Sequence, residues 1–267
     1  MLALMSFQAG SHVAALTSSS PRFLLSSSTQ SCQVTPSLRT SSSGETLLEI
    51  LPSVLAPLPI TFRRIQQLTM IQDVIDTTGA SKDKIVMFRL TRSSISHYLL
   101  SCWQEVSQIW RYLGYPALYE PLRIAGLLYM ECVLATTRPN SAVLWGFGNN
   151  LKSALCRTLS RHLPHNWDRN PLSSKILLWI IFLGGLANSE VRDSLWHAAE
   201  VHHYMMVLGM KSWQELKSCL SELLWTEKVN DAAYEALWKQ IQQLTVWRRK
   251  GGTKEVRVVR WWACNKS

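Results

Sequence analysis

The most apolar segment of the chain is the unbroken run Ile176 to Ala187, which lies in the stretch KILLWIIFLGGLANSEVRDSLW. A membrane-spanning helix needs about 20 apolar residues, so this run of twelve is too short for a span. The pair Gly184-Gly185 is not followed by the spacing of a phosphate-binding loop. The run therefore predicts a helix that is apolar on every side, and such a helix must be surrounded by other elements.

The rest of the sequence predicts an all-α fold around that helix. The chain has 267 residues, of which 47% are hydrophobic, and its 12 Trp indicate a folded core. Helical periodicity runs through residues 45–246, and a strand pattern is absent there. We expect an array of about eight or nine packed amphipathic helices, with a disordered Ser-rich head at 1–44 and a basic Trp/Arg tail at 247–267.

Start and stop signals divide the array into helices. The cleanest apolar stripe runs over 94–113, Pro121 and Ser141 open helices, and Gly79 and Gly209 end them. Ser212 and Glu215 form a capping-box pattern, S-x-x-E. The predicted helices are 46–56, 61–76 with Thr61 as its cap, 94–113, 121 to just before Pro139, 141–163, 172–187, 191–208, one following Ser212, and 230–244. We expect six tryptophans to bridge these helices, namely Trp103, Trp110, Trp179, Trp196, Trp225 and Trp238.

The two ends carry most of the formal charge of +10. Residues 1–44 contain thirteen Ser, two Arg and no acid, which is typical of a disordered head. A mitochondrial transit peptide has a similar composition. In the tail, Arg248, Arg249, Lys250 and Lys254 lie near tryptophans. That composition suits nucleic-acid contact, a nuclear-import signal, or a solubilising end with neither role.

The six cysteines lie too far apart for a zinc site or a stapled secreted domain. The shortest spacing between them is 24 residues, and no CxxC pair occurs. Cys102, Cys132, Cys156 and Cys219 fall on apolar helical faces. We therefore expect reduced core residues of an intracellular protein.

Two patterns invite a cofactor site, and neither fits one. His197, Glu200, His202 and His203 suggest a metal site, but His197 and His202 are five positions apart, about 140° off a common helical face. We expect surface or partly buried histidines. The stretch Gly146 to Leu151 reads GxGxxL, lacks the third glycine and follows a helical pattern, so we expect no nucleotide site.

No sequence pattern identifies a catalytic group. The motifs GxSxG, SxxK and GxxxxGK[ST] are all missing from the sequence. We expect a protein without catalytic residues and without a cofactor. An enzyme with a site between helices is the weakest of the alternatives.

Three pieces of the body, in order, resemble the C-terminal regulatory domain of fungal-specific transcription factors of the zinc-binuclear-cluster family. They are EPLRIAGLLY at 120–129, LLWIIFLGGLA at 177–187, and LGMKSWQEL at 208–216 followed by LLW at 223–225 and the segment 231–238. The likeness covers about residues 45–245. It implies that 177–187 is a core helix of an all-helical module, and that Gly184 and Gly185 let a neighbouring helix approach closely.

The chain departs from that family at its N-terminal end. The family's DNA-binding unit contains six closely spaced cysteines, whereas residues 1–44 contain Cys32 alone. Either the protein is a relative without the cluster or upstream sequence is missing, and sequence-specific DNA contact is in doubt. The resemblance implies a nuclear, non-catalytic regulatory module that acts through transcriptional regulatory proteins, its own dimer or an effector. The alternative is a helical scaffold outside transcription, mitochondrial if the head is a transit peptide.

Overall fold

The computed structural model of the protein describes residues 58–79, 81–113, 118–135, 141–161, 171–188, 194–226 and 231–249. Within these segments the chain forms eight α-helices, α3 to α10, and no strand. The all-helical prediction is confirmed. Contacts between residues divide the chain into two compact units, Met1–Pro116 and Ala117–Ser267. The predicted helix at 46–56 lies outside the described residues, as do the head and most of the tail.

The first unit contains helices α3 (Leu58–Thr78) and α4 (Lys82–Leu113), which pack against each other. Gly79 ends α3 with a φ of 73°, a left-handed conformation that only glycine adopts readily. Its N–H donates to the carbonyl of Ile75, as in a helix C-terminus. Because the loop between α3 and α4 is so short, the two helices run antiparallel.

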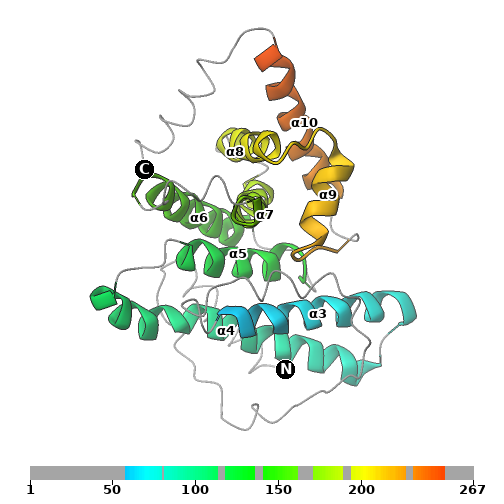
Figure 1. Ribbon diagram of the computed structural model, residues 1–267. Helices are drawn as coiled ribbons and strands as arrows, with labels where there is room; N and C mark the ends of the chain where they lie inside the picture. The colour runs from blue at the N-terminus through cyan, green and yellow to red at the C-terminus, as the bar shows by residue number, and fades with distance from the viewer. Residues whose placement is uncertain are drawn as a thin grey trace. The chain divides into compact units, whose positions relative to one another are not determined.

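The second unit is organised around α7 (Pro171–Ala187). This helix packs against α5 (Tyr119–Cys132), α6 (Ser141–Arg161), α8 (Ser194–Val207), α9 (Trp213–Ser221) and α10 (Asp231–Arg249). In Figure 1 α7 is seen nearly end-on, with α5, α6, α8 and α9 around it. Residues Ile176 to Leu186 of α7 are all buried. The prediction of a central core helix is therefore confirmed.

The connection from α8 to α9 has the stop signal and the start signal that the sequence predicts. Gly209 follows α8 with a φ of 72°. Ser212 then caps α9: its hydroxyl accepts from the N–H of Glu215 at 3.2 Å, and the Glu215 carboxylate accepts from the N–H of Ser212 at 3.1 Å. Behind this cap, α9 and the residues after it contribute five buried side chains, Leu216, Cys219, Leu220, Leu223 and Leu224.

Several helix boundaries differ from the prediction. Helix α3 begins at Leu58 rather than Thr61, because Pro59 fits the first helical turn, where its missing N–H has no role. Thr61 is consequently a buried residue inside the helix and not its cap. Helix α4 begins at Lys82, twelve residues before the apolar stripe starts.

The ends of α5 and α10 also differ. Helix α5 ends at Cys132, well before Pro139, and the next residues turn so that Leu134 becomes fully buried. Helix α10 continues to Arg249, about one turn beyond the predicted end, because no Gly or Pro interrupts it before Gly251.

Replacing the cap of α9 should weaken the second unit. We expect Ser212→Ala to lower the free energy of unfolding by about 1 kcal/mol, because the first turn of α9 loses a side-chain acceptor. The measurement is urea denaturation followed by far-UV circular dichroism. Ser218→Ala, an exposed position within the same helix, is the matched control and should change stability by less than about 0.5 kcal/mol. Equal effects of the two substitutions would contradict a capping role.

The cap should also depend on pH. Two backbone N–H donors, from Lys211 and Ser212, lower the pKa of Glu215 below its usual 4.5. A depressed pKa means that the carboxylate supports folding fully above pH 4.5, and that this support is lost as the pH falls through the folded-state pKa.

Candidate functional site

The main polar feature inside the second unit is a junction of α6, α7 and α8. It comprises Gly148 on α6, Gly184 on α7, Asn188 directly after α7, and His197 on α8, and we call it the glycine junction. Asn188 and His197 are both 0% exposed. The backbone N–H of Asn188 donates to the carbonyl of Gly184 at 3.2 Å, so Asn188 continues the helical turn and shares a face with Gly184.

The glycines are required because polar side chains occupy the space where a Cβ atom would be. A Cβ on Gly148 would lie 2.5 Å from Nδ2 and 2.7 Å from Oδ1 of Asn188. A Cβ on Gly184 would lie 2.6 Å from Nε2 of His197 and 3.2 Å from a methyl of Leu151. A Cβ on the neighbouring Gly185 would likewise lie 2.8 Å from a methyl carbon of Leu237 on α10. The expectation that Gly184 and Gly185 allow close approach is thus confirmed, toward both α8 and α10.

Asn188 has an unusual environment for a carboxamide. Within the described part of the chain, neither its Oδ1 nor its Nδ2 has a hydrogen-bond partner, although both atoms are buried. A buried amide without partners costs about 1–3 kcal/mol for each unmet group. The sequence gives Gly148 only as part of a GxGxxL pattern that fits no nucleotide site, and it singles out no role for Asn188, so neither was expected to be part of a site. Only their proximity across two helices reveals the junction.

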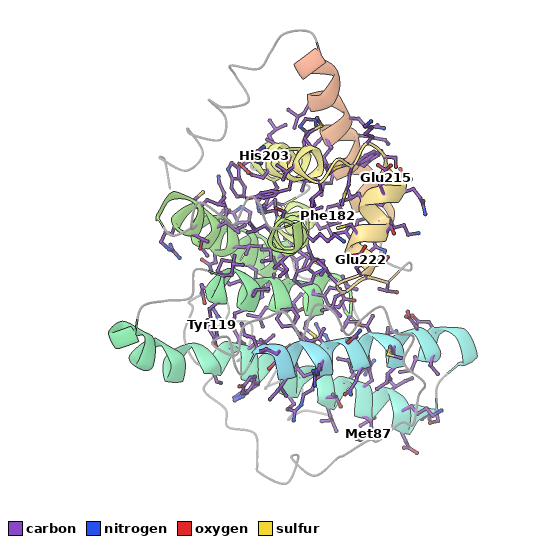
Figure 2. The ribbon with its side chains drawn as sticks, in the orientation of Figure 1. Met87, Tyr119, Phe182, His203, Glu215 and Glu222 are labelled. Atoms are coloured by element: carbon purple, nitrogen blue, oxygen red, sulfur yellow. The ribbon has the colours of Figure 1, made fainter. Side chains whose placement is uncertain are left out.

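The histidine cluster on α8 is spread around the helix. His202 is 7% exposed and Glu200 is 2% exposed. The expectation of surface or partly buried histidines is therefore wrong for His202, and also for His197, which is 0% exposed. Its ring lies edge-on to Trp196, with centroids 4.8 Å apart. His203, labelled in Figure 2, instead packs its ring against Tyr204. Among the described residues, no three His, Cys, Asp or Glu side chains come close enough to hold a metal ion.

An aromatic cluster occupies another side of α7. Phe182, labelled in Figure 2, has ring contacts with Trp213, Trp225 and Tyr234, with centroids 5.7 to 6.2 Å apart. Trp213 also contacts Trp238 on α10 at 5.5 Å. The cluster therefore ties α7, α9, α10 and the loop after α9 together.

Polar contacts reinforce the same side of α7. The indole N–H of Trp179 donates to the carbonyl of Leu224 at 2.9 Å. Lys175 forms an ion pair with Glu222, which is labelled in Figure 2 at the end of α9. The prediction that tryptophans bridge helices is confirmed for Trp179, Trp225 and Trp238. Trp196 is 2% exposed, and its ring contacts His197 of its own helix. The side chains of Trp103 and Trp110 lie outside those that the structure describes.

The basic residues predicted for import or nucleic-acid contact fall at the C-terminal end of α10. Arg248 and Arg249 belong to its last turn. Lys250 and Lys254 lie outside the described residues. The structure therefore does not test whether these four residues form a site, and the assignment stays a prediction.

One of the cysteine predictions is wrong. Cys156 on α6 is disulfide-bonded, whereas a reduced thiol was expected. Sequence spacing could not reveal this pairing, because at least 24 residues separate any two cysteines of the chain. Cys132 and Cys219 are free thiols, as predicted. Desolvation, with a smaller effect of the Glu131 charge, raises the pKa of Cys132 to about 12, and desolvation raises that of Cys219 to about 11.

None of the described helices combines the length and the hydropathy that a membrane crossing requires.

The glycine junction is the best candidate site in the described residues. It can offer hydrogen-bond donors and acceptors from the buried carboxamide of Asn188. Its chemistry is that of binding, because hydrogen bonding is what a carboxamide contributes.

The comparisons with known proteins identify no relative. No protein-family model, curated protein or solved structure gives a significant match to the chain.

Adding a methyl group to Gly184 should destabilise the second unit. Overpacking costs about 1–3 kcal/mol, which exceeds the gain of up to about 1 kcal/mol from replacing a helical glycine by alanine. We expect Gly184→Ala to lower the free energy of unfolding by about 1–2 kcal/mol in urea denaturation. Combining it with His197→Ala tests the cause, because removing the ring that opposes the methyl should make the double variant more stable than the two single losses predict. Strict additivity would contradict the contact.

Cys132 and Cys219 should resist alkylation in the folded protein. At pH 8 a thiol with a pKa of about 12 is ionised in only about one molecule in 10⁴. We expect iodoacetamide to label these two residues quickly only after unfolding, as read by peptide mass spectrometry.

The raised thiol pKa values also predict a sign for the alkaline response. Burial raises the pKa of both thiols above the ordinary value of 9.0. Below pH 9.0 the thiols are protonated in both states, and their contribution to the stability of the folded state is complete. That contribution is lost as the pH rises through about 11 and 12. Rapid labelling of the native protein at pH 8 would contradict the burial of these thiols.

Proposed function

We propose that the chain is a non-catalytic transcription-regulatory module of the kind found C-terminally in fungal zinc-binuclear-cluster transcription factors. It acts in the nucleus through contacts with transcriptional regulatory proteins, with its own second copy, or with an effector. It does so without a zinc cluster in residues 1–44, and direct DNA contact is not part of the proposal. The proposal starts from the likeness of residues 120–129, 177–187, 208–216, 223–225 and 231–238 to that domain.

One observation supports the proposal: the pieces that carry the likeness converge on α7. The piece at 120–129 forms most of α5, and the ring of Tyr129 lies 6.1 Å from that of Trp179. The piece at 223–225 accepts the Trp179 hydrogen bond through Leu224 and contacts Phe182 through Trp225. The piece at 231–238 contributes Tyr234, stacked on Phe182 at 5.8 Å, and Leu237, which lies against Gly185.

The pieces that carry the likeness belong to one packed core rather than to separate parts of the chain, which is what a single regulatory module requires. Residues that must pack together constrain one another through their volumes. The shared pieces thus describe one packed module.

The first piece also contains a charged pair within the fold. Arg123 donates from Nε and Nη2 to the two carboxylate oxygens of Glu120, at 2.8 and 2.9 Å. Arg123 is only 5% exposed, so this bidentate pair neutralises a charge that would be costly to bury alone. The pair therefore gives Glu120 and Arg123 of the E-P-L-R sequence a structural role that is independent of any role in DNA binding.

A tethering assay tests the function directly. The full chain is fused to an unrelated DNA-binding domain in a fungal host, and transcription of a reporter is measured. We expect a several-fold rise or fall relative to the DNA-binding domain alone. Phe182→Ala, which removes the centre of the aromatic cluster, should abolish the effect, whereas the exposed control Lys239→Ala should retain it.

The same strain separates the proposal from its alternative. A fusion that is nuclear and expressed, yet leaves the reporter unchanged, would count against transcriptional regulation. Imaging of a C-terminally tagged full chain completes the test. A mitochondrial signal with a processed N-terminus would instead favour the helical scaffold outside transcription.

A further inference from the structure

We propose that the disulfide at Cys156 is a redox-sensitive switch that sets the stability of the second unit. In the closed state the disulfide cross-links α6 within the chain, whereas in the reduced state packing alone holds α6 in place. The inference depends on this bond and on its position in α6, and it is independent of the proposed function.

The bonded cysteine lies on a helix of the core. Cys156 belongs to α6, is disulfide-bonded and is 6% exposed. Its neighbours along the helix, Leu151, Ala154 and Leu155, are at most 3% exposed. Helix α6 packs against both α5 and α7. The cross-link is therefore attached to a helix on which the packing of the second unit depends.

The cross-link closes a long loop of the chain. Cys132 and Cys219 are free thiols, so neither is bonded to Cys156. Of the other cysteines, Cys102 is the nearest to Cys156 in sequence, about 54 residues away. A disulfide stabilises a protein mainly because it restricts the unfolded chain, and the gain increases with the length of the closed loop. For a loop of this length or longer, we expect reduction to raise the equilibrium constant of unfolding by about 30- to 1000-fold.

Thiols from outside the protein control the switch, because the described free cysteines do not attack the bond. Thiol–disulfide exchange needs a thiolate. Burial raises the pKa of Cys132 to about 12 and that of Cys219 to about 11, so both thiols stay protonated at neutral pH. Neither of them exchanges with the Cys156 bond, and the closed state persists until an external thiol reductant opens it.

Reduction transfers two electrons from the reductant to the disulfide. A thiolate of a dithiol reductant attacks one sulfur and forms a mixed disulfide, and the second thiol of the reductant then displaces the protein thiolate. The protein bond breaks, Cys156 and its partner each bind a proton, and the reductant becomes a cyclic disulfide. Because Cys156 is only 6% exposed, attack on its sulfur requires α6 to open locally. The folded unit therefore protects this sulfur from the reductant.

The experiment compares the closed and reduced states of the full chain. The protein is purified without reductant, and its urea midpoint is measured by tryptophan fluorescence with and without dithiothreitol. We expect dithiothreitol to lower the midpoint by about 1 M. Cys156→Ser should have the lower midpoint under both conditions. Cys219→Ala removes a free thiol of similar burial, so it is the matched control and should respond to dithiothreitol as the unmodified chain does.

Three results would each overturn the proposal. The first is a midpoint of the unmodified chain that does not change with dithiothreitol. The second is a Cys156→Ser variant that responds as strongly as the unmodified chain. The third is a loss of the response in Cys219→Ala, which would assign the effect to a different cysteine.

Alkylation provides a second measurement that does not need a folded variant. The unmodified chain is unfolded in urea and treated with iodoacetamide without reductant, and its peptides are analysed by mass spectrometry. We expect Cys132 and Cys219 to be alkylated, and Cys156 to be alkylated only after dithiothreitol is added. Alkylation of Cys156 without reductant would show that the bond is absent and would overturn the proposal even if Cys156→Ser fails to fold.

Discussion

The packing of α7 on all sides is the constraint on which the second unit depends. Its residues from Ile176 to Leu186 are buried without interruption, so no face of this helix can be left to solvent. Five other helices pack against it. Each hydrophobic side chain buried in this way contributes about 1.5–3 kcal/mol relative to an exposed one.

The size of the α7 side chains decides which helix lies where. Large rings at Trp179 and Phe182 face the α9 and α10 side, where other aromatic residues fill the space between helices. Small residues at Gly184 and Gly185 face α8 and α10, where His197 and Leu237 take the room that side chains would occupy. One helix thus combines an aromatic side, where large rings fill the space between helices, with a glycine side, where the helices pack closely.

The cysteines bear on where such a protein functions. The nucleus is a reducing compartment, and disulfides persist mainly in oxidising ones. The disulfide at Cys156 is therefore at odds with the proposed nuclear location, whereas the free thiols of Cys132 and Cys219 agree with it. The redox state of Cys156 in cells is accordingly informative about location, separately from any reporter response.

The sequence by itself determined the helical class, the central position of α7, the capping box at Ser212 and the termination at Gly79 and Gly209. These features depend on local patterns, since periodicity, caps and left-handed glycines act within a few residues. Only the tertiary structure decided that Asn188 meets Gly148, that His197 is buried against Gly184, and that Cys156 is paired. It also set the ends of α5 and α10 and the division near residue 116. These features depend on contacts between residues far apart in the chain, and such contacts leave no periodic trace in the sequence.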